Sequence, residues 1–329
     1  MMFDLKSTIR PFFYSGTQSA LQAPLKALGF KFERRRKGDL GVSLWRLKTR
    51  KKKDTLVGTK RFVFIPGFGD SPVFWLGVMT LLLPRLRAQY DEIVFFDFPG
   101  FSGLYYGEAA FSDIDSYFSH GMEVLDQLQA HSLMGHSLGG WLATHYCVSF
   151  DRGQRPARAK KPEIVIIGSP PNAMTDEHCE EQWKETFNLA LEGQFEKFVG
   201  HMFAKVPWIV KSNSKQLKWF FSKPEIQSFM KSIRRDHLVK EELKHLPAQT
   251  YLLWGDQDQI NFYRWSKEWL KHAPRSLKLV TFPGVGHMLH METPFRVAYM
   301  LGKILAPAGK VSTIEFVRRT IVRVTSALV

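Results

Sequence analysis

The stretch from Met134 to Gly140 has the residue types expected around a nucleophile. It contains the pattern Gly-x-Ser-x-Gly, with Ser137 between Gly135 and Gly139. A serine hydroxyl is a weak nucleophile unless a sharp strand-to-helix turn holds it away from the chain and aims it at a base. Such a turn crowds the residues on either side of the serine, and glycine fits there because it lacks a Cβ. The pattern therefore predicts that Ser137 is a nucleophile. The alternative is a glycine-rich turn with a spectator serine.

Candidate partners for this serine follow two later strand-like runs. Asp256 and Asp258 come after the run at 250–254, and His287 comes after the run at 277–282. Catalytic groups in an open parallel sheet gather at the carboxyl ends of the strands, so all three side chains are candidates for the same site. The order along the chain is serine, aspartate, histidine. At this stage both aspartates remain open.

The elements around these residues indicate an α/β protein with a mostly parallel, twisted sheet that helices cover on both faces. Near-continuous apolar strands separated by helices are typical of such a sheet. Two more strands are expected on either side of a turn at 38–41. The apolar strands are expected at 61–66, 91–97, 130–134, 164–167, 250–254 and 277–282, and the helices at 75–86, 111–128, 141–150 and 294–305.

The alternation of strands and helices stops after residue 171. Residues 172–247 contain helical patterns with aromatic residues of the exposed type and no strand-like run, which predicts an inserted helical cap over the strand ends. The predicted domains are a basic, amphipathic N-terminal extension at 1–29, a core at 30–171 and 248–308, the cap at 172–247, and a basic tail at 309–329.

From about residue 30 to 306 the sequence resembles the α/β-hydrolase superfamily. The motifs that carry this resemblance are Gly-His-Ser-Leu-Gly-Gly at 135–140, Leu-Leu-Trp-Gly-Asp-Gln-Asp-Gln at 252–259 and Gly-Val-Gly-His-Met-Leu-His-Met-Glu-Thr-Pro at 284–294. Within the superfamily it is most similar to capped lipases and esterases of the monoacylglycerol-lipase type. One departure is Pro66, where the family usually has histidine, and this puts the hydrogen bonding of the following loop in doubt.

The resemblance implies a role for each site residue. Ser137 would attack an acyl carbonyl, and His287 would be its general base. Of the two acids, the family pattern selects Asp258 to orient the histidine. The backbone N–H groups of Phe68 and Leu138 would form the oxyanion hole, which stabilises the negative charge that develops in the reaction. Relatives with an aspartate nucleophile, the haloalkane dehalogenases and soluble epoxide hydrolases, are excluded by the serine.

Other polar residues near these motifs receive structural interpretations. His136 is expected to pack in the turn, His290 to cap or pack, and Asp97 to lie in the turn after its strand. No group of histidine, cysteine and aspartate has the spacing of metal ligands, so neither a metal nor a cofactor is expected.

The net charge of +15 lies mostly at the ends of the chain, with +11 in residues 1–60, +3 in residues 310–329 and only +1 in residues 61–309. A nearly neutral catalytic part argues against selection of an anionic substrate. The basic N-terminus also carries apolar residues, which predicts peripheral contact with an anionic membrane surface; the alternative is packing on the domain. No nucleic-acid recognition module accompanies the basic clusters, so nucleic acid is not an expected partner.

Two cysteines cannot form a disulfide framework, the start of the chain lacks a secretory signal, and the longest apolar stretch is too short to span a bilayer. We therefore expect a cytoplasmic protein, with peripheral membrane contact as an open alternative.

The expected function is hydrolysis of carboxylic esters with lipid-like or medium-chain acyl groups, because a cap with aromatic walls favours an apolar acyl chain. Hydrolysis of a C–C bond in a meta-cleavage diketone, or of a thioester, by the same residues is the alternative. A non-catalytic binding protein on this fold is disfavoured because no triad residue is missing.

Overall fold

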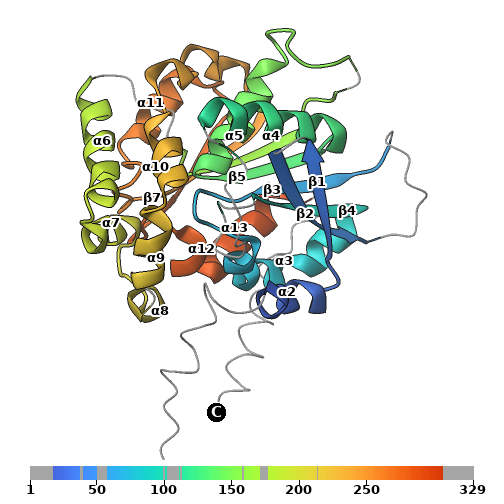
Figure 1. Ribbon diagram of the computed structural model, residues 1–329. Coiled ribbons are helices and arrows are strands. Elements are labelled where there is room, and N and C mark those ends of the chain that lie inside the picture. The colour runs from blue at the N-terminus through green and yellow to red at the C-terminus, as the bar shows by residue number, and fades with distance from the viewer. Residues whose placement is uncertain are drawn as a thin grey trace, which may run out of the picture.

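The computed structural model describes residues 18–37, 40–49, 58–98, 101, 111, 113–157, 159–170, 177–212 and 214–306. A single sheet of eight strands forms its centre, in the order β1-β2-β4-β3-β5-β6-β7-β8 (Figure 1). The predicted fold class is confirmed. The tail, most of the N-terminal extension and the basic cluster at 50–53 lie outside the described residues.

The first two strands pair with each other antiparallel, and β2 pairs antiparallel with β4, whereas β3 to β8 all run parallel. The strands are β1 (Lys31–Lys37), β2 (Leu40–Lys48), β3 (Arg61–Ile65), β4 (Glu92–Asp97), β5 (Ser132–His136), β6 (Ile164–Gly168), β7 (Gln249–Gly255) and β8 (Lys278–Phe282). The central strands are buried on both faces, which is why their sequences are almost continuously apolar.

Helices cover both faces of this sheet, and the apolar side chains of β3 alternate between two cores. Phe62 and Phe64 pack into the core that also contains residues of α2, α3 and α13. Val63 and Ile65 pack into the core beneath α4, α5 and the inserted helices. The covering helices are α2 (Gln18–Ala27), α3 (Leu76–Gln89), α4 (Ile114–Leu128), α5 (Leu138–Ser149), α11 (Trp265–His272), α12 (Leu289–Glu292) and α13 (Pro294–Ile304).

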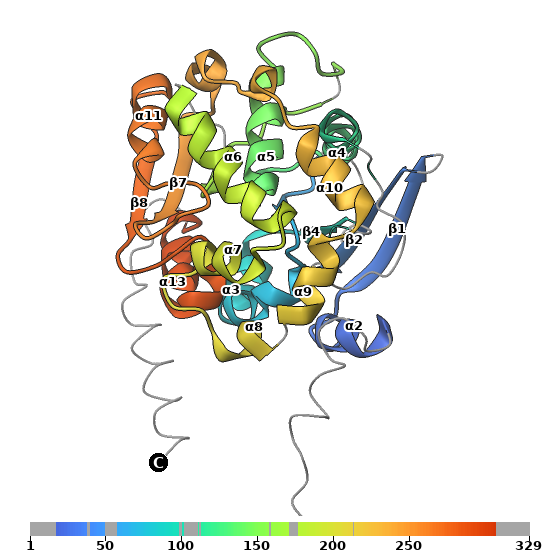
Figure 2. The same ribbon diagram turned by 60° about the vertical axis from the view of Figure 1, so that its left-hand side comes forward.

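The chain between β6 and β7 forms helices in its described part. They are α6 (Glu177–Leu191), α7 (Phe195–Met202), α8 (Trp208–Ser212), α9 (Ser214–Phe221) and α10 (Pro224–Lys231), followed by the short 3₁₀ turns η2 (Arg235–His237) and η3 (Glu241–His245). Figure 2 shows α6, α7, α9 and α10 side by side in front of the body of the protein. The division of the chain into domains stays a prediction.

Most aromatic residues of these helices are buried, contrary to their interpretation as exposed. The side chains of Phe198, Phe221 and Phe229 are among those in the core, whereas Trp208 and Trp219 are exposed. Three of these helices, α7, α9 and α10, have eight residues each, and each of them buries apolar side chains in the core.

The strand and helix at the predicted nucleophile begin at other residues than the apolar pattern indicates. The strand spans residues 132–136 rather than 130–134, and the helix begins at Leu138 rather than at residue 141. The strand is defined by its pairing with β6, in which Ser132 is opposite Ile164 and His136 is opposite Gly168. Only the serine therefore separates the strand from the helix.

Asp97 also differs from its predicted place in a turn, because it is the last residue of β4, is buried and accepts a hydrogen bond from Trp45 Nε1 at 3.3 Å. In the described part of the chain no helix is both long and apolar enough to cross a bilayer.

Candidate active site

Ser137 occupies a strained turn between β5 and α5. Its backbone has φ 50° and ψ −120°, a conformation that L-residues rarely adopt. Two close backbone approaches keep the turn sharp. A Cβ at Gly135 would lie 2.2 Å from the carbonyl oxygen of Gly139, and one at Gly139 would lie 2.3 Å from that of Ile65. Both glycines are therefore required by the packing of helix against strand.

The structure brings the three predicted triad residues together, although they are far apart in the sequence. The distance from His287 Nε2 to Ser137 Oγ is 2.9 Å, and that from His287 Nδ1 to Asp258 Oδ2 is 2.8 Å. The histidine and the aspartate are both buried. Because Asp258 accepts from Nδ1–H, the Nε2 atom is free to accept the serine proton.

The two aspartates after β7 lie in different surroundings. Asp258 Oδ1 accepts the backbone N–H groups of Ile260 and Asn261, both at 2.9 Å, which fixes the carboxylate toward His287. Asp256 Oδ1 instead accepts the N–H of Gly284 at 2.7 Å and ties the loop after β7 to the loop after β8. The choice of Asp258 over Asp256 agrees with this geometry.

The loop after β3 lies directly beside the serine, since a Cβ at Gly67 would be 3.1 Å from the Cβ of Ser137. The N–H groups of Phe68 and Leu138 have no acceptor among the described residues, so both are available to a ligand oxygen. The loop after Pro66 still has hydrogen bonds, because the N–H of Gly69 donates to the carbonyl oxygen of Phe101 at 3.0 Å.

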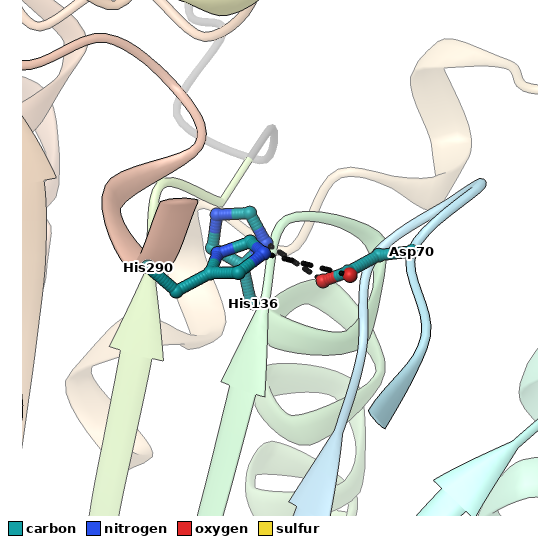
Figure 3. A group of neighbouring side chains, drawn as sticks. All are labelled: Asp70, His136 and His290. Atoms are coloured by element: carbon teal, nitrogen blue, oxygen red, sulfur yellow. Dashed lines mark ion pairs between the residues drawn. The ribbon is translucent and has the colours of Figure 1, made fainter. Parts of the chain in front are cut away.

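A second group of titratable side chains, Asp70, His136 and His290, is buried, and the three lie close together (Figure 3). Asp70 comes from the loop after β3, His136 from the end of β5 and His290 from α12. His136 Nδ1 lies 3.8 Å from Asp70 Oδ2, and His290 Nε2 lies 3.5 Å from Asp70 Oδ1. No sequence pattern indicated this group, because 66 and 154 residues separate its members.

The donor atoms of this group lie within 4.8 Å of one another, close enough to hold a metal ion, although no metal ligands were predicted. Other contacts already account for the position of the carboxylate. Trp75 Nε1 donates to Asp70 Oδ2 and the N–H of Ser71 donates to Oδ1, each at 2.7 Å, and the ring of His290 stacks on that of Trp75 at 4.1 Å. We therefore describe the group as a buried polar network and assign no metal to it.

This network also contacts the backbone of His287, the histidine that is hydrogen-bonded to Ser137. His136 Nε2 donates to the carbonyl oxygen of His287 at 3.0 Å. Burial, with smaller contributions from His287 and His290, lowers the pKa of His136 to about 3, so its ring is neutral near pH 7. Burial acts to raise the pKa of Asp70, but the two histidines and the bond from Trp75 outweigh it and the pKa is lowered.

Glu292, which the sequence analysis did not single out, fastens the histidine loop to the inserted helices. Its Oε1 accepts the N–H of Gly286 at 2.8 Å, and its Oε2 accepts the N–H groups of Ala204 and Lys205 at 3.0 and 3.3 Å. Burial raises its pKa, against these three hydrogen bonds. The Met-Glu-Thr-Pro run after the histidine is the sequence signal that could have identified it.

Two cavities of about 30 Å³ each border Ser137. Side chains of the inserted helices form part of the wall of both cavities, among them Phe187. The ring of Phe68 is held under those helices, 5.5 Å from Phe229 in a stacked arrangement and 5.7 and 5.9 Å from Phe220 and Phe221. The cavity linings are mainly apolar. The first is lined by Phe68, Ser137, Leu138, Trp141, Phe187, Phe229, Met230, Ile233, Ile260 and Asn261.

A mostly parallel sheet with a serine on a strained strand-to-helix turn and a buried histidine beside it is the arrangement of an α/β hydrolase. Residues 62–298 match the sequence profile of the alpha/beta hydrolase family, and the chain belongs to this family. No curated protein sequence matches the chain.

Several solved structures share the fold at low sequence identity. A bacterial membrane phospholipase A superposes with a TM-score of 0.66 at 17% identity, over 92% of each chain. A candidate lipase from Acinetobacter baumannii gives 0.64 at 16%, over 87% of this chain and 96% of the other. A 2-hydroxy-6-oxo-6-phenylhexa-2,4-dienoate hydrolase from Rhodococcus gives 0.60 at 16%, over 84% and 98%.

Proposed function

We propose that this protein is a serine hydrolase of carboxylic esters with apolar, lipid-like or medium-chain acyl groups. The hydrogen-bonded series Ser137–His287–Asp258 carries the proposal, because it provides a nucleophile, a base and an orienting carboxylate in sequence. The family membership and the mainly apolar linings of the cavities support it.

The proposed reaction has two halves. Ser137 Oγ attacks the ester carbonyl carbon while His287 Nε2 takes its proton, and the oxyanion is bound by the N–H groups of Phe68 and Leu138. The histidine returns this proton to the departing alcohol as the C–O bond breaks, which leaves an acyl-enzyme. Water then attacks the acyl carbon, with His287 again as the base, and the carboxylic acid leaves with regeneration of the serine hydroxyl. Asp258 stabilises the charged imidazole in both halves.

Chromogenic esters of graded acyl length test this proposal, together with labelling by a fluorophosphonate. We expect turnover and labelling in the wild type, and a loss of at least about 10³-fold in turnover for Ser137→Ala. Ser222→Ala, at an exposed serine on the inserted segment, is the matched control and should retain both. Equal turnover and labelling of Ser137→Ala and the wild type would refute the role of the serine.

Hydrolysis of a meta-cleavage diketone or of a thioester is the second candidate, and the Rhodococcus hydrolase gives the diketone reaction a precedent on this fold. A dienoate substrate carries a carboxylate, but no arginine or lysine is among the described residues that line the two cavities at Ser137. This favours the ester. Faster turnover of a dienoate or acyl-thioester panel than of any ester would make the second candidate function the preferred one.

A further inference from the structure

The segment 201–223 concentrates positive charge on the inserted helices. It contains five lysines and no aspartate or glutamate, whereas residues 61–309 as a whole carry a net charge of only +1. Three of these lysines, Lys205, Lys211 and Lys218, are exposed. The segment is therefore a local basic surface on a nearly neutral catalytic part.

Two large aromatic side chains are exposed on the same segment. Trp208, the first residue of α8, is 69% exposed, and Trp219 in α9 is 47% exposed. Lys223 Nζ lies 4.2 Å from the centre of the Trp219 ring, so cation and aromatic ring occur together. We name Lys205, Trp208, Lys211, Lys218 and Trp219 the Lys–Trp surface.

Helix α8, which carries part of the Lys–Trp surface, lies at one end of the molecule. In both views α8 lies at the same end as α2, whereas α11 lies at the opposite end (Figures 1 and 2).

We propose that the Lys–Trp surface docks on an anionic lipid bilayer. Tryptophan is favoured at the level of the lipid headgroups, where its ring is apolar and its N–H is wet, and lysine is attracted to anionic headgroups. Neither contribution alone gives stable attachment, but the two occur here on adjoining helices.

Part of this surface is the outer side of α9, a helix that covers the candidate active site. Lys218 and Trp219 are exposed, whereas the next two residues of α9, Phe220 and Phe221, are buried and contact the ring of Phe68. Binding on the outer side of α9 would therefore act on a helix whose inner side contacts the loop beside Ser137. The docking itself is independent of the proposed function, because it needs no chemistry at Ser137.

Co-sedimentation of the full-length protein with vesicles tests the docking. Vesicles of ether-linked phosphatidylcholine, with or without ether-linked phosphatidylglycerol, contain no ester that the protein could hydrolyse. We expect binding to the anionic vesicles that weakens as NaCl is raised. Lys211→Glu with Lys218→Glu should weaken it by at least about 30-fold, since each lysine contributes about a fivefold factor. Trp208→Ser with Trp219→Ser should also weaken it.

Variants at the opposite end of the molecule are matched controls, which distinguish docking by the Lys–Trp surface from a general effect of the protein's charge. Lys244→Glu with Lys267→Glu makes the same change of charge at exposed positions, and Leu270→Ser removes an apolar side chain that is 44% exposed. These variants should bind as the wild type does, and circular dichroism should show that every variant folds. Three results would overturn the proposal. The first two are equal binding to neutral and anionic vesicles, and binding of the Lys211/Lys218 variant as tight as that of the wild type. The third is a wild-type dimer that the same two substitutions dissociate, because the surface would then bind a second copy of the chain.

Discussion

Replacement of Glu292 by glutamine tests how the loop that carries His287 is held. The carboxylate accepts three backbone N–H groups, one from Gly286 on Oε1 and two from Ala204 and Lys205 on Oε2. Glutamine offers one oxygen and one NH₂ group, so in either orientation at least one N–H group faces another donor. A hydrogen bond to a charged group contributes about 1.5–3 kcal/mol, so we expect a loss of about 2 kcal/mol in the free energy of unfolding.

The same substitution should lower the rate, because Gly286 immediately precedes the histidine. A displacement of the base by about 1 Å can cost about 10²-fold, and we expect a decrease of about 10-fold in kcat with a smaller change in KM. Urea unfolding and steady-state turnover of a chromogenic ester measure the two effects. Glu196→Gln, at an exposed acid of α7, is the control and should change neither quantity. A Glu292→Gln variant with wild-type stability and kcat would refute this account of the loop.

Three further predictions concern residues within the sheet and its turns. Asp258→Asn should lower kcat by about 10⁴-fold with little change in stability, because an amide can hold His287 in the wrong tautomer; a loss under tenfold would contradict the assigned role. Gly139→Ala should destabilise the fold by about 3 kcal/mol in urea unfolding, because its Cβ would meet the carbonyl oxygen of Ile65 at 2.3 Å, and wild-type stability would contradict the packing. His136 stays neutral until about pH 3 in the folded state but takes up a proton near pH 6.5 when unfolded, so stability should fall by about 2 kcal/mol between pH 7 and pH 5. His136→Gln should show a smaller fall, and an equal fall would exclude this residue as the cause.

Features that depend on local sequence could be predicted. The apolar runs indicated the parallel strands because a strand buried on both faces has no polar side to show. The two glycines around Ser137 indicated the turn because a Cβ at either position would meet backbone atoms. The resemblance to the family, whose pattern places the acid three residues after Gly255, favoured Asp258 over Asp256, and the different partners of the two acids agree with that choice.

Features that depend on contacts between distant segments could not be predicted. The network of Asp70, His136 and His290 forms where the loop after β3, the end of β5 and α12 meet, and no spacing along the chain encodes that meeting. The first residue of β5 follows from pairing with β6 and not from the apolar run. The buried side of α9 was missed because a helix of eight residues has too few turns to show a period clearly.

The inserted helices leave the sheet and return to it at neighbouring strands. The chain departs after β6 and comes back in β7, which pairs with β6 in parallel register, Ile164 opposite Gln249. In topological terms the insert is one long loop, and the cost of closing a loop grows only slowly with its length. Changes of length or sequence there leave the strand register unaltered, provided that they keep Ala204 and Lys205, whose N–H groups bind Glu292 and so help to hold the loop of His287. Exchange of this segment between relatives is thus a route by which new substrate preferences could evolve, or be engineered, on an unchanged catalytic frame.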